Sequence, residues 1–468
     1  MIGGLRPYPR MRDSGVPWLG SMPEHWQLRR MKAALRERVQ KGFPDEPLLA
    51  ATQTKGVVAK EDYESRTVLA LKDLHLLKLV LANDFVISLR SFQGGIEYAR
   101  QRGIISPAYT ILTARDADTH GFLAALFKSK PYLDNLSLYV TGIRQGQNID
   151  YEKLSRSEFP FPPLAEQAAI VRFLDHMDRR IRRYIRAKQK LIALLEEQKQ
   201  TIIECAVTRG RDAGVRLKPS GLEWLNDVPE HWEVRPAKWF FSEIDERSET
   251  GSEELLSVSH ITGVTPRSEK NITMFLAASN VGHKLCRPGD MVVNTMWAWM
   301  AALGISSRSG MVSPSYAVYR PRPSSQLIGE YADLLLRTAP YKSEYLCKST
   351  GIRLSRLRLY PDEFLRIKVL CPPPDEQREI LDIVKSETAE TRRAIGQAQS
   401  QIGLLREYRT RLVADVVTGK LDVREAATRL PGETAEPEPI ADADMLGDGN
   451  RGDGEAALDG GAEEGADA

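Results

Sequence analysis

Apolar residues recur every three or four positions in one long stretch of the chain, a pattern typical of a long helix. From about Leu164 to Val207 there is neither glycine nor proline, and the apolar positions advance in alternating steps of four and three. Pro163 precedes this stretch and Glu166 lies in its first turn, where a carboxylate suits the positive end of a helix. The pattern predicts a helix with one apolar seam, formed by Ile170, Leu174, Met177, Ile181, Leu191, Leu195 and Ile202.

A second stretch, from about Asp375 to Val417, follows the same pattern less regularly. Glu387, Thr391 and Gln401 fall on its seam, and Gly396 and Gly403 lower its helix propensity. Two such helices can bury their seams only against each other or against a partner. We therefore expect them to pair as an antiparallel coiled coil. The apolar seam positions of the second helix include Ile380, Val384, Leu405 and Leu412.

The rest of the chain mixes short β-like runs with glycine, proline and shorter helical stretches, and much of it occurs twice. "SGVPWLGSMPEHW" (14–26) returns as "SGLEWLNDVPEHW" (220–232), and four further blocks return in the same order. These are "ANDFVIS" and "PGDMVVN", "GIISPAYTIL" and "GMVSPSYAVY", "TGIR" twice, and "PPLAEQ" and "PPPDEQ". Such order indicates a tandem duplication. The shared "PEHW" favours a structural role over a catalytic one for His25 and His231.

These patterns predict an α+β fold with a pseudo-two-fold internal repeat. Two similar α/β domains are separated by the two long antiparallel helices. The expected boundaries are 1–160 for the first domain, 161–210 for the first helix, 211–370 for the second domain, 371–427 for the second helix and 428–468 for a disordered acidic tail.

Charge divides the chain unevenly. The net charge is +2, but the segment from Pro431 to Ala468 holds twelve acidic residues and one arginine, which leaves a basic body. A basic body favours a polyanionic partner such as nucleic acid. The four cysteines form no C-x-x-C pair and no apolar run is long enough to span a membrane, so we expect a cytoplasmic protein without a structural zinc.

Signatures of catalysis are missing from the sequence. It contains no G-x-x-x-x-G-K-[ST], no H-E-x-x-H and no G-x-S-x-G motif. We therefore expect a binding protein with no catalytic residues and no metal site. Candidate contacts to DNA lie in loops after the β-like runs, where arginine and glutamine suit guanine and adenine edges. They are Thr54, Lys55, Arg90, Ser91, Gln93, Gly94, Arg144, Gln145, Arg267, Asn294, Trp297, Trp299, Arg353, Arg356 and Arg358.

The repeated blocks carry a family resemblance. With its duplicated "PEHW" entry, "GD(M/F)V"-like runs, "TGIR" and "PP..EQ" helix starts, the chain resembles the specificity (S) subunit of type I restriction–modification enzymes from about Ser14 to Ala427. The acidic tail lies outside the resemblance. The family implies that each domain recognises one half of a bipartite site in double-stranded DNA, and that the helices fix the gap between the halves.

The resemblance also implies partners. Two modification subunits would bind S-adenosylmethionine and methylate adenine N6, while restriction subunits would use ATP and Mg²⁺, so this chain needs no cofactor and no membrane. Because the two domains diverge outside the shared blocks, we expect an asymmetric target.

Two alternatives stay open: a coiled-coil scaffold whose end domains bind protein, and a specificity component of a different defence system.

Overall fold

The computed structural model describes residues 5–53, 55–62, 73–89, 91–141, 148–210, 214–270, 279–352 and 356–431, with only the backbone of Phe92. It comprises two compact units. Among described residues, the first unit takes those up to Gln189 and those from Gln399 onward, and the second takes Lys190–Ala398. The predicted disordered tail, 428–468, lies outside the described residues beyond Pro431.

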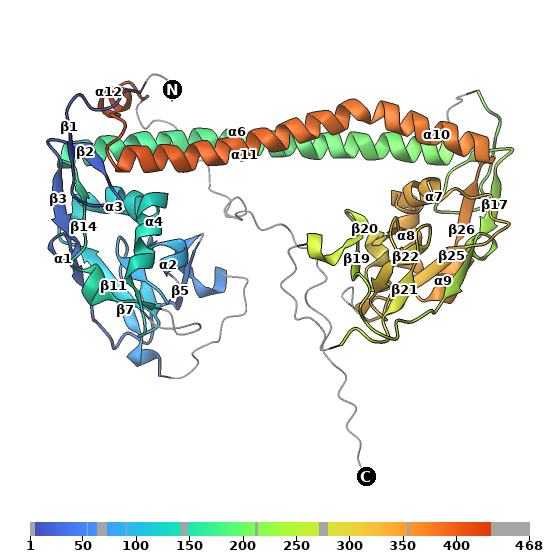
Figure 1. Cartoon of the computed structure of the whole chain (residues 1–468), viewed down its shortest axis with the longest axis horizontal. Helices are drawn as coiled ribbons and strands as arrows, with labels where there is room; N and C mark the ends of the chain where they lie inside the picture. Colours follow the sequence, from blue (N-terminus) through green and yellow to red (C-terminus); the bar gives the residue numbers. More distant parts are fainter. Residues whose placement is uncertain are drawn as a thin grey trace, which may run out of the picture. The chain divides into compact units, whose positions relative to one another are not determined.

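The first unit is built on an antiparallel sheet of order β4-β11-β8-β9, with short helices beside it (Figure 1). Its elements are β1 (Met11–Asp13), β2 (Ser21–Pro23), β3 (Gln27–Arg30), β4 (Leu35–Glu37), β5 (Leu49–Thr52), β6 (Gly56–Ala59), β7 (Lys78–Val80), β8 (Phe85–Ile87), β9 (Glu97–Tyr98), β10 (Gly103–Ile105), β11 (Thr110–Ala114), β12 (Val140–Thr141), β13 (Asn148–Ile149), β14 (Glu158–Phe161), α1 (Met31–Ala34), α2 (Ser91–Gly94), α3 (His120–Phe127), α4 (Lys130–Leu136), α5 (Tyr151–Leu154) and α12 (Arg424–Thr428).

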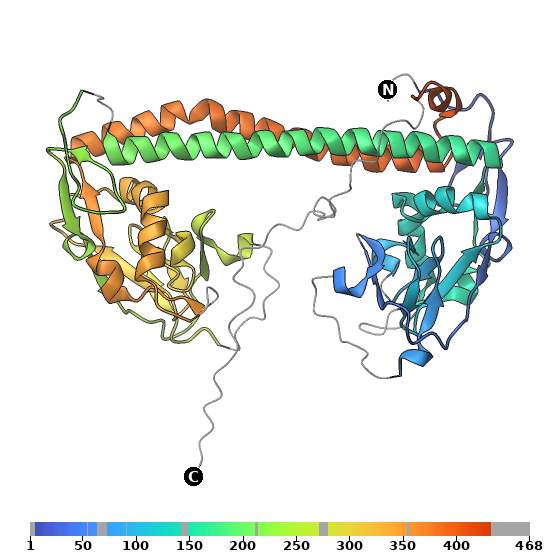
Figure 2. The same cartoon turned by 180° about the vertical axis from the view of Figure 1, so that it is seen from behind.

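The second unit repeats this topology with a sheet of order β18-β25-β22-β23. Figure 2 shows its strands and short helices from behind, coloured from green to orange. Its elements are β15 (Leu217–Lys218), β16 (Val228–Pro229), β17 (Glu233–Pro236), β18 (Phe241–Ile244), β19 (Leu256–Ser259), β20 (Gly263–Pro266), β21 (Lys284–Cys286), β22 (Met291–Val293), β23 (Leu303–Ile305), β24 (Gly310–Val312), β25 (Ala317–Pro321), β26 (Lys368–Cys371), α7 (Gly329–Leu336), α8 (Ala339–Lys348), α9 (Pro361–Arg366) and the 3-10 helix η8 (Ala298–Met300).

Each strand pairing around one sheet has a counterpart around the other. The hairpin β5–β6 corresponds to β19–β20, the pair β7–β10 to β21–β24, and the pair β3–β14 to β17–β26. The structure thus confirms the predicted α+β class and the internal repeat.

The long helices enter the cores of both units. Helix α6 (Leu164–Arg209) is continuous over 46 residues, about 70 Å. In the first unit its Ile170 and Leu174 share a hydrophobic core with Leu412 and Val416 of α11 (Ala389–Val417). In the second unit, Val207 of α6 packs in the same core as residues of α10 (Pro374–Glu387). Residue numbers rise along one helix as they fall along the other, so the pairing within each unit is antiparallel, as predicted.

The second long helix is interrupted where the sequence predicted a continuous one. Thr388 separates α10 from α11, and its Oγ1 donates a hydrogen bond of 2.6 Å to the Val384 carbonyl. Buried positions run 380, 384, 388 and 391, so Thr388 takes the seam place predicted for Glu387, while Thr391 keeps its own. Further along, Ile402 is buried and Gln401 is exposed, which corrects that seam position, whereas Leu412 is buried as predicted.

The other predicted seam positions differ in burial. Ile170, Leu174, Ile181, Ile380, Val384 and Leu412 are buried, whereas Met177, Leu195, Ile202 and Leu405 are half-buried. Leu191 is 41% exposed and is not a buried seam residue of this chain. Neighbouring Leu194 is exposed as well, at 54%, so this part of α6 presents apolar side chains to its surroundings.

The repeated "PEHW" phrase and the "PP..EQ" helix start meet in each unit. Trp26 Nε1 donates to Glu166 Oε1 at 2.9 Å, and His25 Nε2 lies 2.8 Å from Glu166 Oε2. Trp232 Nε1 donates to Glu376 Oε1 at 3.0 Å, and His231 Nε2 lies 2.7 Å from Glu376 Oε2. Both indoles are buried. These contacts give the histidines the structural role that their shared context predicted.

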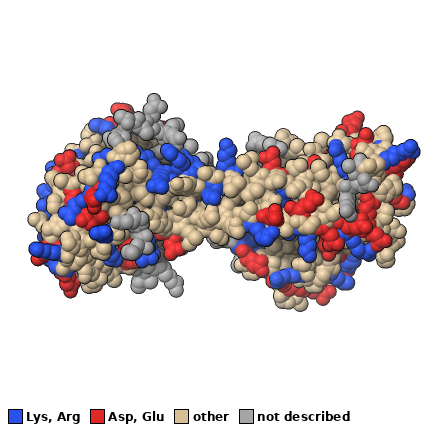
Figure 3. Space-filling view, turned by 90° about the horizontal axis from the view of Figure 1, so that it is seen from above, with Lys and Arg blue, Asp and Glu red and all other residues tan. Residues whose placement is uncertain are grey.

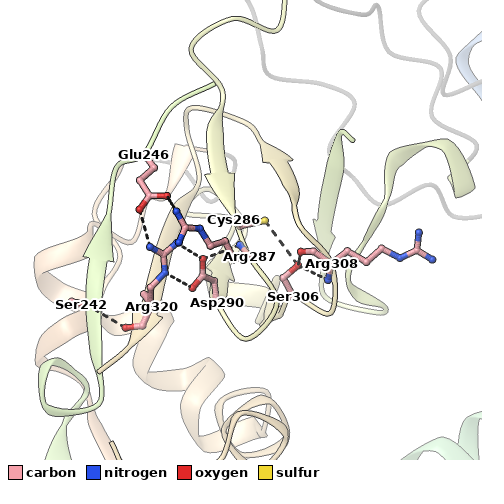
Figure 4. Close-up of polar contacts among 8 residues, drawn as sticks. All are labelled: Ser242, Glu246, Cys286, Arg287, Asp290, Ser306, Arg308 and Arg320. Carbon is pink, nitrogen blue, oxygen red and sulfur yellow. Dashed lines mark hydrogen bonds and ion pairs between the residues drawn. The ribbon is translucent and has the colours of Figure 1, made fainter. Parts of the chain in front are cut away.

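The aspartate of the repeated "ND/GD" run is also structural. In the second unit Asp290 accepts a bond from the Arg287 backbone nitrogen and faces the Arg320 guanidinium, which also reaches Glu246 (Figure 4). Asp290 is 2% exposed. In the first unit, Asp84 accepts equivalent bonds from the Leu81 backbone nitrogen and from Arg38. A buried carboxylate paired with arginine therefore closes the turn before β8 and before β22.

Candidate nucleic-acid interface

Two loops of the first unit lie in contact and carry several of the predicted DNA-contacting residues. One is the turn between β5 and β6, and the other is the α2 turn after β8. A Cβ atom on Gly94 of α2 would lie 2.6 Å from Gln53 Cγ, so the loops approach closely because residue 94 is glycine. Gln53 Nε2 donates to Gln93 Oε1 at 3.1 Å, and both glutamines are exposed.

An ion pair between Lys128 and the buried Glu97 holds these loops. Lys128, which caps the end of α3, donates through Nζ to the Gln53 carbonyl (3.2 Å), the Gly94 carbonyl (2.7 Å) and Glu97 Oε2 (2.7 Å). Glu97 is 1% exposed, and burial raises its pKa to about 7 although the nearby ammonium acts in the opposite direction. All three ammonium donors of Lys128 are used, which fixes the two loops relative to each other.

The second unit presents different side chains from the equivalent turn. Trp297 and Trp299, which flank the start of η8, are half-buried and stack with ring centroids 5.7 Å apart. Ala301 ends this turn with a positive φ of 59°, as Gly95 does in the first unit with 88°. The scaffold is shared, but the first unit has the Gln93 amide where the second has the Trp299 indole.

An equivalent cation supports the second unit's hairpin turn. Arg337, at the end of α7, donates to the His260 carbonyl at 2.7 Å and to the Ile261 carbonyl at 3.0 Å. Asp333 lies beside Arg337 and accepts a hydrogen bond from the Ile305 nitrogen at 3.1 Å. Burial raises the pKa of Asp333. In both units, a basic residue that follows the helix thus anchors the hairpin turn.

Thr141 and Thr350, the first residues of the two "TGIR" segments, each pair across a hairpin. In the first unit β12 pairs with β13 on either side of residues 142–147. In the second unit Thr350 and Arg358 form the matching bridge, and Arg358 Nε donates to Thr295 Oγ1 at 3.2 Å. Thr295 precedes the Trp297 turn. The structure therefore brings the "TGIR" hairpin and the turn after β22 together in the second unit.

The predicted contacts have different placements. Thr54, Arg90, Arg144, Gln145 and Arg353 lie outside the described residues. Arg356 and Gln93 are exposed, whereas Lys55, Gly94, Arg267, Trp297, Trp299 and Arg358 are half-buried.

Ser91 and Asn294 require a correction. Ser91 is 1% exposed and its Oγ accepts a bond from the Ser88 nitrogen at 2.8 Å. Asn294 is 0% exposed, with Nδ2 bonded to Tyr316 Oη and Oδ1 accepting from the Met296 nitrogen. Both side chains shape their loops and present no polar group at the surface, so direct base contact is not their role.

Three functional candidates were missed by sequence reasoning. Gln53, Lys128 and Arg337 act through contacts between segments far apart in the chain. The one available signal was the position of Lys128 and Arg337 directly after equivalent helices of the repeat.

The rest of the described surface offers little alternative chemistry. Described residues include no group of three or more His, Cys, Asp or Glu side chains that could hold a metal ion. None of the helices in the described part has the length and apolarity to cross a membrane. On the face seen in Figure 3, basic and acidic side chains are interspersed, so that face is not uniformly cationic.

Solved structures share this fold. A chain from a structure described as the basis of "complex assembly and conformational transition of the type I R-M system" matches with a TM-score of 0.56 and 16% identity, covering 86% of this chain and 99% of that one. The HsdS subunit of Thermoanaerobacter tengcongensis matches with a TM-score of 0.39, 17% identity, and 86% and 98% coverage. The type I restriction–modification S subunit of M. genitalium matches with a TM-score of 0.31, 13% identity, and 88% and 98% coverage.

No protein-family model and no curated protein matches the chain. The first structural match shows that this chain has a fold found in the type I restriction–modification system. It confirms, for the fold, the resemblance predicted from the repeated blocks.

Proposed function

We propose that this chain is the DNA-recognition (specificity) subunit of a type I restriction–modification complex. One observation carries the proposal: two units of the same topology present different side chains from equivalent turns. After β8 and β22 these are Gln93 and Trp299, and between β5–β6 and β19–β20 they are Gln53 and His260. Related scaffolds with divergent loops suit recognition of two different half-sites. The target is therefore bipartite and asymmetric, with an unspecified spacer between the halves.

In this proposal the long helices set the spacer and receive the partner proteins. Exposed Leu191 and Leu194 on α6, and Leu404 on α11 with 65% exposure, are apolar side chains available to a protein partner. Two modification subunits would supply S-adenosylmethionine and methylate adenine N6, and restriction subunits would supply ATP-dependent cleavage with Mg²⁺. This chain would have no catalytic residue and no cofactor of its own, and would act in the cytoplasm.

The experiment that tests the proposal is a map of N6-methyladenine across the host genome with the gene intact and deleted. Loss of methylation at one asymmetric bipartite motif supports it and reveals the sequence recognised. Unchanged methylation at all motifs contradicts it, and favours the coiled-coil scaffold whose end domains bind protein. Partner proteins recovered with the tagged chain separate a type I complex from a different defence system.

A further inference from the structure

The exposed amides of Gln53 and Gln93 form a pair with a defined hydrogen-bonding pattern. Each amide has one oxygen acceptor and one NH₂ donor, and the 3.1 Å bond between them uses one of each. The pair therefore offers outward one free oxygen and one free NH₂ group, whichever amide donates. Both side chains are exposed, so these groups are accessible to a ligand.

The backbone that carries the pair is held in place. Lys128 Nζ donates to the backbone carbonyl of Gln53 itself and to that of Gly94, the residue after Gln93. Glu97 anchors the ammonium from the interior. The Gly94 backbone packs so close to the Gln53 side chain that a Cβ at position 94 would clash with it. The loop backbones therefore need little ordering on binding, which favours specific recognition.

One base edge matches the outward groups. In the major groove adenine presents a donor, N6–H₂, beside an acceptor, N7. Guanine presents two acceptors, cytosine a donor and thymine an acceptor with a methyl group. A free oxygen beside a free NH₂ group complements the adenine edge, whereas at guanine the free oxygen would face an acceptor.

We propose that Gln53 and Gln93 together recognise the adenine of one A·T pair in the half-site bound by the first unit, and that Lys128 positions them. The proposal deepens the DNA-recognition function and rests on it. Gln53 and Lys128 thereby become specificity-determining and positioning residues, respectively. The second unit has an indole at position 299, equivalent to 93, so its half-site is recognised differently.

The test maps N6-methyladenine in a gene-deleted host complemented with variant genes. With Gln53→Ala/Gln93→Ala, one A·T position in one half-site becomes degenerate, with a loss of discrimination of about 5- to 150-fold, while the other half-site is unchanged. With Gln93→Glu, an amide donor is replaced by a carboxylate acceptor, and preference at that position moves toward cytosine N4–H₂.

Two further variants separate positioning from folding. Lys128→Met lowers discrimination at the same position, and Lys128→Arg restores part of it because a cation again reaches the two carbonyls. Gln101→Ala, an exposed glutamine elsewhere in the first unit, leaves the motif unchanged. Matching unfolding temperatures of wild type, the double glutamine variant and Lys128→Met exclude a folding defect in either variant.

The outcomes are distinguishable. This inference alone is overturned if the double glutamine variant still methylates the wild-type motif. It is also overturned if the degeneracy spreads over both half-sites or falls on a G·C pair. A host in which the wild-type gene directs no bipartite methylation overturns the proposed function, and this inference with it.

Discussion

Trp26 Nε1 donates a 2.9 Å hydrogen bond to Glu166 Oε1, and thereby ties the repeated "PEHW" phrase to the first turn of α6. Tyr8 Oη and His25 Nε2 contact the same carboxylate, which is 5% exposed. The twin contact between Trp232 and Glu376 is more open, since the Glu376 side chain is 24% exposed. One buried carboxylate thus accepts bonds from three aromatic side chains in the first unit.

Replacing Glu166 by alanine should destabilise the first unit by about 2–4 kcal/mol, because buried donors lose their acceptor. Glu376→Ala should cost less, because the Glu376 carboxylate and its partner His231 both reach water. Urea-induced unfolding measures both, with Glu379→Ala on exposed α10 surface as a control within about 0.5 kcal/mol of wild type. Equal effects of Glu166→Ala and Glu379→Ala would contradict the role of this contact.

Much of the fold could be predicted because the repeat marks positions whose environments are fixed. Trp26, Glu166 and Asp84 recur with their counterparts, and each makes the same contact in both units. Sequence patterns show periodicity, so α6 was predictable to within a few residues. The break at Thr388 was not, because nothing in the local sequence signals its hydrogen bond to the Val384 carbonyl.

The candidate site was predictable by region rather than by residue. Gln93 belongs to a turn that the sequence identified, but its partner Gln53 is 40 residues away, and Lys128 is 75 residues from Gln53. Ser91 lies two residues from Gln93 yet points inward. The direction of a loop side chain depends on tertiary packing, which periodicity does not contain.

Gly396 and Gly403 of α11 should be replaceable by alanine with a gain in stability. Both face open space, with nothing within 4 Å of a built Cβ atom, and both lie inside a helix. Each substitution should add about 0.5–1 kcal/mol to the free energy of unfolding. Gly419→Ala is the contrasting variant: its φ is +75° and an added Cβ would clash with Pro23, so it should destabilise. Thermal unfolding of the three variants checks the prediction.

Glu97 should make the first unit's stability depend on pH. Its pKa in the folded chain is about 7, above the ordinary value of 4.5, so folding favours the protonated form. Its contribution is fully present below about pH 4.5 and is lost as pH rises through 7, with an upper limit of about 3 kcal/mol. Glu97→Gln removes this titration. The difference in unfolding free energy between wild type and variant should therefore change between pH 5 and pH 8, and a constant difference would refute the assignment.

Arg356, exposed beside the Arg358 bridge, should contact a DNA phosphate. Binding to duplex DNA should weaken steeply between about 50 and 200 mM salt, because phosphate contacts release counterions. Arg356→Ala should reduce the salt slope by about one, while Arg216→Ala, whose side chain is 85% exposed on another part of the unit, should not. Salt titrations of binding measure both slopes. A slope near zero for wild type would favour the protein-binding scaffold instead.

The length of the two long helices should determine the spacer in the DNA target. Each added base pair moves the second half-site by about 3.4 Å and rotates it by roughly 35°, so a stiff connection tolerates one spacer length. Inserting four residues in α6 and four in α11 lengthens each helix by about 6 Å. The methylated motif should then keep both half-sites but acquire a different spacer. Inserting alanines after Pro431, beyond the helices, is the control that should leave it unchanged. If the helix-lengthened variant still methylates the original spacing, the helices do not measure the distance between half-sites.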